Sequence, residues 1–147
     1  RPGDSPSRDD AESSMIHYKE GYLYQTTRPS SWQTVICPQK PITHRYYSLT
    51  AQGLLTINEG FAWDGATSCP EWLVPPECSA PHDALCQMMR TGALPYDTYS
   101  SWVHGLLRDM VEDRRGSLAA WAVFNAVKLA RGGHPDNADD NPEITDP

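Results

Sequence analysis

Three side chains in the middle of the chain are of the types that hydrolytic sites use: Asp64, His82 and Asp83. An imidazole next to a carboxylate places a general base beside a group that binds a metal or handles protons. Asp64 precedes Gly65, and a carboxylate followed by accessible backbone carbonyls is a ligand set for a hard cation such as calcium. The joint occurrence of these residues in the Gly-, Pro- and Ser-rich centre of the chain predicts one functional site there.

Each of these residues also has a purely structural interpretation. Asp83 in a first helical turn would complement the helix dipole, and His82 alone would be a packed or surface histidine. The pair Asp64-Gly65 alone would be a turn. A His-Asp dipeptide is weakly specific, so the residue pattern by itself leaves the function open.

Four cysteines lack the paired spacing of a structural zinc site, and they leave the redox compartment open. Cys69 and Cys78 bracket a Pro-rich loop, and a disulfide between them is geometrically reasonable if the backbone doubles back. Two buried thiols are the alternative, and the sequence does not decide between them.

The first half of the domain is expected to form strands. Segments 15–18, 22–27, 32–36, 44–49 and 54–58 are rich in β-branched and aromatic residues and are separated by turn-forming residues. Gly21 and Gly53 fall where hairpin loops are expected. These segments predict short antiparallel strands.

The second half is expected to form three helices, and apolar residues recur at three-and-four spacing in the second of them. The first is expected over 80–91, with Ser79 as N-cap, Pro81 in its first turn and Gly92 at its end. Strands followed by helices predict an α+β fold, with helices packed on a small antiparallel sheet.

The other two helices are expected over 98–113, behind Asp97 as N-cap, and over 118–131, behind Ser117. Gly132 and Gly133 would end the last helix. This helix is apolar nearly all round, which predicts that it is largely buried or docks on a partner.

The ends of the chain are polar, with 1–14 expected to be a flexible tail and 134–147 an acidic flexible tail. A single domain is expected over 15–133. The net charge of −7 makes nucleic acid an unexpected partner. No apolar run is long enough to span a bilayer, and no signal peptide is visible.

Two sequence blocks carry a resemblance to a known family. The first reads GFAWDGATS from Gly60 to Ser68, and the second reads HDALCQMMR from His82 to Arg90. They resemble a family of uncharacterised proteins of tailed phages and prophages, whose members typically read AWDG(P/A)S and then HDALYQ. This resemblance implies a phage-type protein, found in the virion or in the infected bacterial cell, with a strand-rich half before a helical half.

A more distant similarity links the same residues to secreted calcium-dependent phospholipases, especially small prokaryotic ones. It implies that Asp64 and Asp83 bind calcium with carbonyl groups around Gly65, and that His82 activates a water. It also implies the Cys69–Cys78 disulfide.

The chain departs from both patterns at the residue expected to orient the catalytic histidine. The corresponding stretch contains His104 and no carboxylate. Either His104 or an acid elsewhere, such as Asp97, orients His82, or catalysis has been lost.

Two functions follow from these patterns. One is a calcium-assisted esterase acting on phospholipid, and the alternative is a non-catalytic tail or capsid component whose partners are other virion proteins. A third and weaker interpretation is a small module that recruits a host protein.

Overall fold

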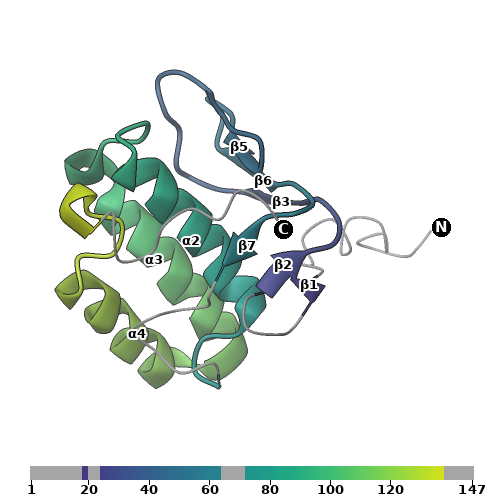
Figure 1. Cartoon of the computed structure of the whole chain (residues 1–147). Helices are drawn as coiled ribbons and strands as arrows, with labels where there is room; N and C mark the ends of the chain where they lie inside the picture. The colour runs from purple at the N-terminus through teal and green to yellow at the C-terminus, as the bar shows by residue number, and fades with distance from the viewer. Residues whose placement is uncertain (1–17, 20–23, 64–71, 138–147) are drawn as a thin grey trace, which may run out of the picture.

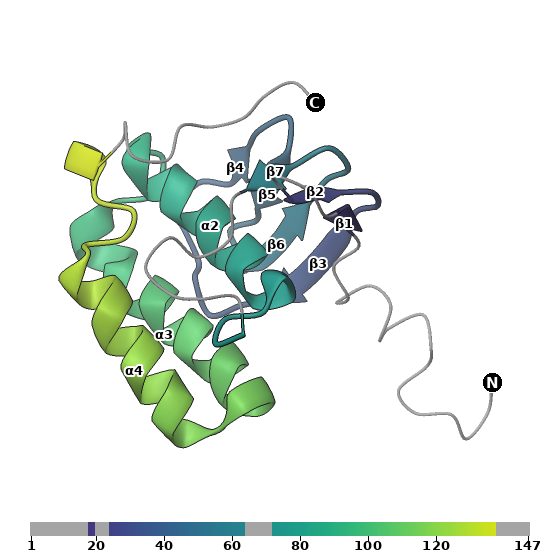
Figure 2. The ribbon, with the colours of Figure 1, turned by 60° about the horizontal axis from the view of Figure 1, so that its bottom comes forward.

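The strands lie on one side of the molecule and three helices on the other, in both views of the ribbon (Figures 1 and 2). The structure is a computed structural model, and it describes residues 18–19, 24–63 and 72–137. Its strand-rich first half is followed by a helical second half. The predicted α+β fold is therefore confirmed.

The strands form two small antiparallel sheets. The first sheet has the order β1-β2-β7 and the second the order β3-β6-β5-β4. The strands of the first sheet are β1 (Tyr18–Lys19), β2 (Tyr24–Thr26) and β7 (Ala62–Trp63). Those of the second are β3 (Ser30–Gln33), β4 (Ile42–Thr43), β5 (Tyr47–Leu49) and β6 (Leu54–Ile57).

Strands β2, β5 and β6 lie inside expected segments, β3 begins two residues before its expected segment 32–36, and β4 and β7 were not expected. Only the end of segment 44–49 is a strand, and β4 precedes it as a separate element. Strand β7 is two residues long, and it pairs with β2 through Tyr24 opposite Trp63. A strand of two residues shows no alternation of apolar and polar side chains, so only its pairing with β2 identifies it.

Three helices follow the strands. They are α2 (Pro76–Arg90), α3 (Tyr96–Arg115) and α4 (Ser117–Leu129), and a short 3-10 helix, η1 (Pro135–Asn137), follows. Gly116 joins α3 to α4 with a φ of 92°. This left-handed backbone conformation favours glycine and turns the chain into an antiparallel pair of helices.

All three predicted N-caps were wrong. Pro75, Pro95 and Gly116 stand at the N-cap positions of the three helices, and none of the three helices has a side-chain cap. Proline fixes φ near its helical value, so Pro76 can begin α2 four residues before the expected start. Ser79 therefore lies inside α2, and Pro81 lies beyond the first turn.

The core has two parts. The larger packs the sheets against α2 and α3, with Leu55, Trp63 and Met88 among its fully buried members. The smaller packs α3 against α4, with Leu107 and Val123 at its centre. Both helices α2 and α3 therefore have buried faces that the sheets or α4 cover.

Helix α4 is covered on one side only. Its Val123 and Val127 are buried, but Leu118, Trp121 and Leu129 are 81%, 64% and 85% exposed. Packing within the chain therefore buries only part of the apolar surface of this helix, which was predicted to be largely buried or to dock on a partner. Among the described residues, no helix is long and apolar enough to cross a membrane.

Candidate functional site

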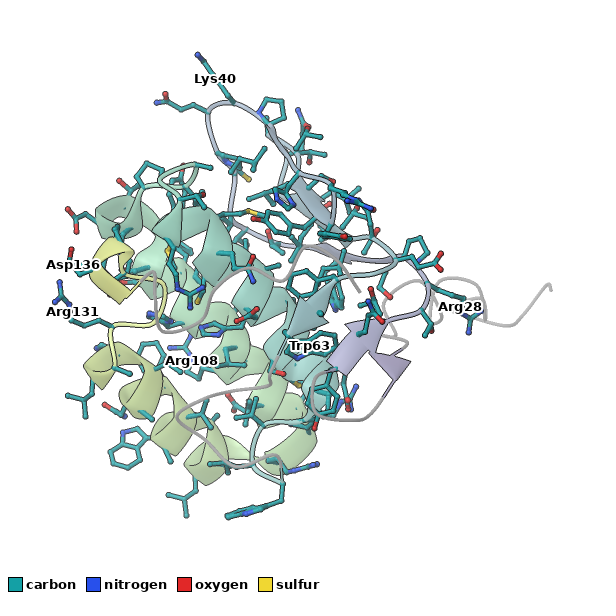
Figure 3. All side chains as sticks on the ribbon, viewed as in Figure 1. Arg28, Lys40, Trp63, Arg108, Arg131 and Asp136 are labelled. Atoms are coloured by element: carbon teal, nitrogen blue, oxygen red, sulfur yellow. The ribbon has the colours of Figure 1, made fainter. Side chains whose placement is uncertain are left out.

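Helix α2 is joined to the end of β7 by a buried hydrogen bond. The indole Nε1 of Trp63 donates to the hydroxyl of Ser79 at 2.9 Å, and that hydroxyl donates to the carbonyl of Pro76 at 3.2 Å. Trp63 lies where β7 faces the helices (Figure 3). This contact fixes the N-terminal half of α2, including the turn that carries His82.

The structure brings His82 and His104 together. Nε2 of His82 lies 3.0 Å from Nδ1 of His104, so one ring donates a hydrogen bond to the other. The two residues come from neighbouring helices α2 and α3, and both are buried. Of the two groups proposed to orient His82, His104 makes a hydrogen bond with it, while Asp97 is exposed in the first turn of α3.

Both imidazoles are held in their neutral form. Burial lowers the pKa of His82 to about 3, and the neighbouring His104 and the charge of Arg90 add to this effect. Burial lowers the pKa of His104 to about 4, with a smaller effect from Lys128. A charged imidazole is disfavoured in a dry environment, because it loses its hydration.

Backbone from the C-terminal side of α4 covers the histidine pair. A Cβ atom on Gly132 would lie 3.2 Å from Cε1 of His104 and 3.8 Å from Cε1 of His82. Gly133 has a φ of 83°, and a Cβ there would lie 3.1 Å from the Cα of Cys86. The two glycines therefore allow this backbone to approach α2 and to pack against the histidine pair.

Asp83 lies one residue from His82 and is also buried. Its Oδ2 accepts a hydrogen bond from Nε2 of Gln87 at 3.2 Å, one turn further along α2. The other amide atom, Oε1 of Gln87, is buried and has no hydrogen-bond partner. Because buried polar atoms are normally paired, this oxygen is a position where a ligand or water is expected.

Two buried thiols lie on α2. Sγ of Cys86 is 3.6 Å from Nε2 of His82, and burial raises the pKa of this thiol, with a further contribution from the charge of Asp83. Burial also raises the pKa of Cys78 to about 11. Both thiols are therefore protonated and unreactive at neutral pH.

Several predicted site residues lie outside the described part of the chain. These are Asp64, Gly65 and Cys69. The predicted Cys69–Cys78 disulfide therefore stays a prediction, with Cys78 found as a free thiol. Among residues 18–19, 24–63 and 72–137, no three His, Cys, Asp or Glu side chains form a group that could hold a metal ion.

Sequence reasoning missed Ser79 as an anchor, Cys86 as a neighbour of His82 and Gln87 as the partner of Asp83. The spacing of four residues from His82 to Cys86 and from Asp83 to Gln87 was the available signal, because such pairs share one face of a helix. The contact between Trp63 and Ser79 had no such signal, since its two residues belong to different elements.

Comparisons with protein-family models, with curated proteins and with solved structures found no match to this chain.

Proposed function

We propose that this chain is a phage-type protein of the virion or infected cell, with a calcium-assisted ester hydrolase site at the junction of α2 and α3. His82 acts as the general base that activates a water, and phospholipid is the proposed substrate. The contact between His82 and His104 carries this proposal, because a general base needs a partner that fixes its ring and tautomer.

Either ring can be the donor in this hydrogen bond, and catalysis by His82 requires one of the two arrangements. If Nε2–H of His82 donates to Nδ1 of His104 at 3.0 Å, the lone pair that accepts a proton is on His82 Nδ1, which lies 3.8 Å from Sγ of Cys86. Water then attacks the ester carbonyl while its proton passes to Nδ1, and the leaving alcohol later takes that proton. His104 is a positioning residue in this scheme.

The side chains of Asp83 and Gln87 fit a hard cation. Calcium binds carboxylate and amide oxygens, and Asp83 supplies the first while the unpaired Oε1 of Gln87 supplies the second. Asp64 and carbonyls around Gly65 are the further ligands that the sequence predicts. Bound calcium would polarise the ester carbonyl and stabilise its developing negative charge.

A thermal melt with millimolar calcium or with chelator tests the metal site, with wild-type protein compared with Asp83→Asn. We expect calcium to raise the melting temperature of the wild type, because a ligand that binds only the folded state stabilises it. Asp83→Asn should lose this rise. A wild-type melting temperature that is the same with calcium and with chelator would remove the basis for the proposal.

Hydrolysis of a phospholipid by the calcium-loaded protein tests the role of the histidines. His82→Gln should abolish turnover, and His104→Ala should lower kcat with little change in KM, since His104 does not touch the substrate. His104→Asp places the carboxylate of the related patterns beside His82 and should restore part of kcat. Equal turnover in the wild type and His82→Gln would exclude His82 as the base.

One observation favours the alternative, a non-catalytic virion component. A pKa of about 3 makes His82 a weak base, and its burial leaves it as part of a packed polar junction. A general base works best with a pKa near the working pH. This alternative predicts that the protein co-purifies with assembled particles in fixed stoichiometry, and that His82→Gln lowers stability without affecting any catalysis.

A further inference from the structure

A groove of about 540 Å³ lies apart from the histidine pair, on another face of α3. The end of β3 with the chain that follows it, the middle of α3 and Phe124 of α4 line it. Its volume falls within the range of small-molecule sites. One of its lining residues, Arg108 of α3, is labelled in Figure 3.

The groove has an apolar wall that is partly exposed, beside polar residues. Trp102 is 57% exposed and Val35 is 69% exposed, and Leu106 and Phe124 are half-buried beside them. Large apolar side chains gain free energy when they leave water, so this arrangement favours a ligand with an apolar body.

Gly105 lines the groove from the middle of α3. Glycine weakens a helix interior, and here neither backbone nor packing requires it. A Cβ at this position would meet only the guanidinium of Arg108, at 3.5 Å, which is ordinary contact. The missing side chain therefore leaves space in the groove that the fold itself does not need.

The charges at the groove favour an anion. Arg108 and Lys128 each lie 4.9 Å from the centre of the Phe124 ring, which lines the groove. The carboxylate there belongs to Asp109, which forms an exposed ion pair with Arg108 at 3.2 Å. Arg108 and Asp109 both line the groove and balance each other, so the excess positive charge comes from Lys128, which lies against the Phe124 ring outside the lining.

From these observations we infer that the groove binds a small anionic amphiphile. Its acyl or aromatic body lies over Gly105 between Trp102 and Phe124, and its carboxylate or similar head group is held by Arg108 and Lys128. This site is separate from the histidine pair and does not depend on the proposed hydrolysis.

Isothermal titration calorimetry with laurate, kept below its micelle concentration, tests this site on the full chain. We expect saturable binding with one laurate per chain. Dodecyltrimethylammonium has the same chain length and the opposite charge, and it should bind at least tenfold more weakly. Equal binding of the two amphiphiles would overturn the assignment of an anionic head group.

Three variants locate the site. Gly105→Leu should fill the groove and weaken laurate binding at least tenfold without lowering the melting temperature, because leucine is a better helix former than glycine. Trp102→Ala should weaken binding by removing a wall. Trp121→Ala is the matched control, since Trp121 is similarly exposed but does not line the groove, and its affinity should stay within twofold of the wild type.

Two results would overturn the inference. The first is the absence of saturable laurate binding, or laurate binding that Gly105→Leu leaves unchanged. The second is self-association of the wild type in analytical ultracentrifugation that Gly105→Leu abolishes, because the groove would then be occupied by a second copy of the chain.

Discussion

The neutral histidine pair should make the protein lose stability as the pH falls below about 6.5. In the folded chain the pKa of His82 is about 3 and that of His104 about 4. In the unfolded chain both return to about 6.5, so the unfolded state takes up protons that the folded state does not. The stabilisation by the pair is fully present above pH 6.5 and falls as the pH drops toward 4.

The size of the loss follows from the two pKa values of each ring. At pH 5 an unfolded histidine with a pKa of 6.5 gains about 2 kcal/mol from protonation, and the folded pair gains almost nothing. The free energy of unfolding should therefore be lower at pH 5 than at pH 7 by about 4 kcal/mol. Carboxylates contribute mainly below about pH 5, so the interval from 5 to 7 reports on histidines.

Urea denaturation at half-unit steps from pH 7 to pH 5 measures this slope. The double variant His82→Gln/His104→Gln should have a much flatter profile, whatever its stability at pH 7. His44→Asn is the matched control, because His44 is a histidine outside the pair and asparagine keeps an acceptor for the amide of Tyr46. A flat wild-type profile, or a double variant with the wild-type slope, would refute the assignment of two dry neutral imidazoles.

Two further changes test the packing around the site. Gly133→Ala should lower the free energy of unfolding by roughly 1 kcal/mol or more beyond Gly92→Ala. Both glycines have φ near +84°, but only a Cβ on Gly133 would meet other atoms, including Met89 Cε at 2.6 Å. Equal losses of the two variants in urea denaturation would show that α2 shifts to accommodate the added methyl group. Ser79→Ala removes the hydroxyl that accepts a hydrogen bond from Trp63, and it should lower the free energy of unfolding by about 1–3 kcal/mol. The control Ser101→Ala, at an exposed serine, should change it by almost nothing. Equal melting temperatures of the two variants would show that the contact between Trp63 and Ser79 does not stabilise the fold.

The sequence predicted the type of each main element, because type depends on local patterns that the chain carries itself. Turn residues and β-branched runs located the strands, and three-and-four spacing located α3. The helix starts were wrong because proline or glycine occupies every N-cap position, so the usual polar cap was absent. Strand β7 was missed because its existence depends on pairing with β2.

The candidate site was predicted in its residue types and only partly in its contacts. The contact of His82 with His104 was expected only because His104 was a candidate to orient His82. Helix spacing alone does not say which turns of two helices meet. The burial of the pair was not predicted, because it depends on Gly132, which is 28 positions after His104. The roles of Asp64 and Gly65 stay predictions.

Gly132 packs close to the histidines and Gly133 packs close to Cys86 and Met89 of α2, which couples the end of the domain to the histidine pair. Burial disfavours protonation of His82 and His104, and the backbone at Gly132 contributes to that burial. By thermodynamic linkage, protons must therefore favour release of this segment, and release of the segment must favour protonation. Acidification should then loosen the end of the domain before the sheets unfold, and amide hydrogen exchange after α4 would report that local opening.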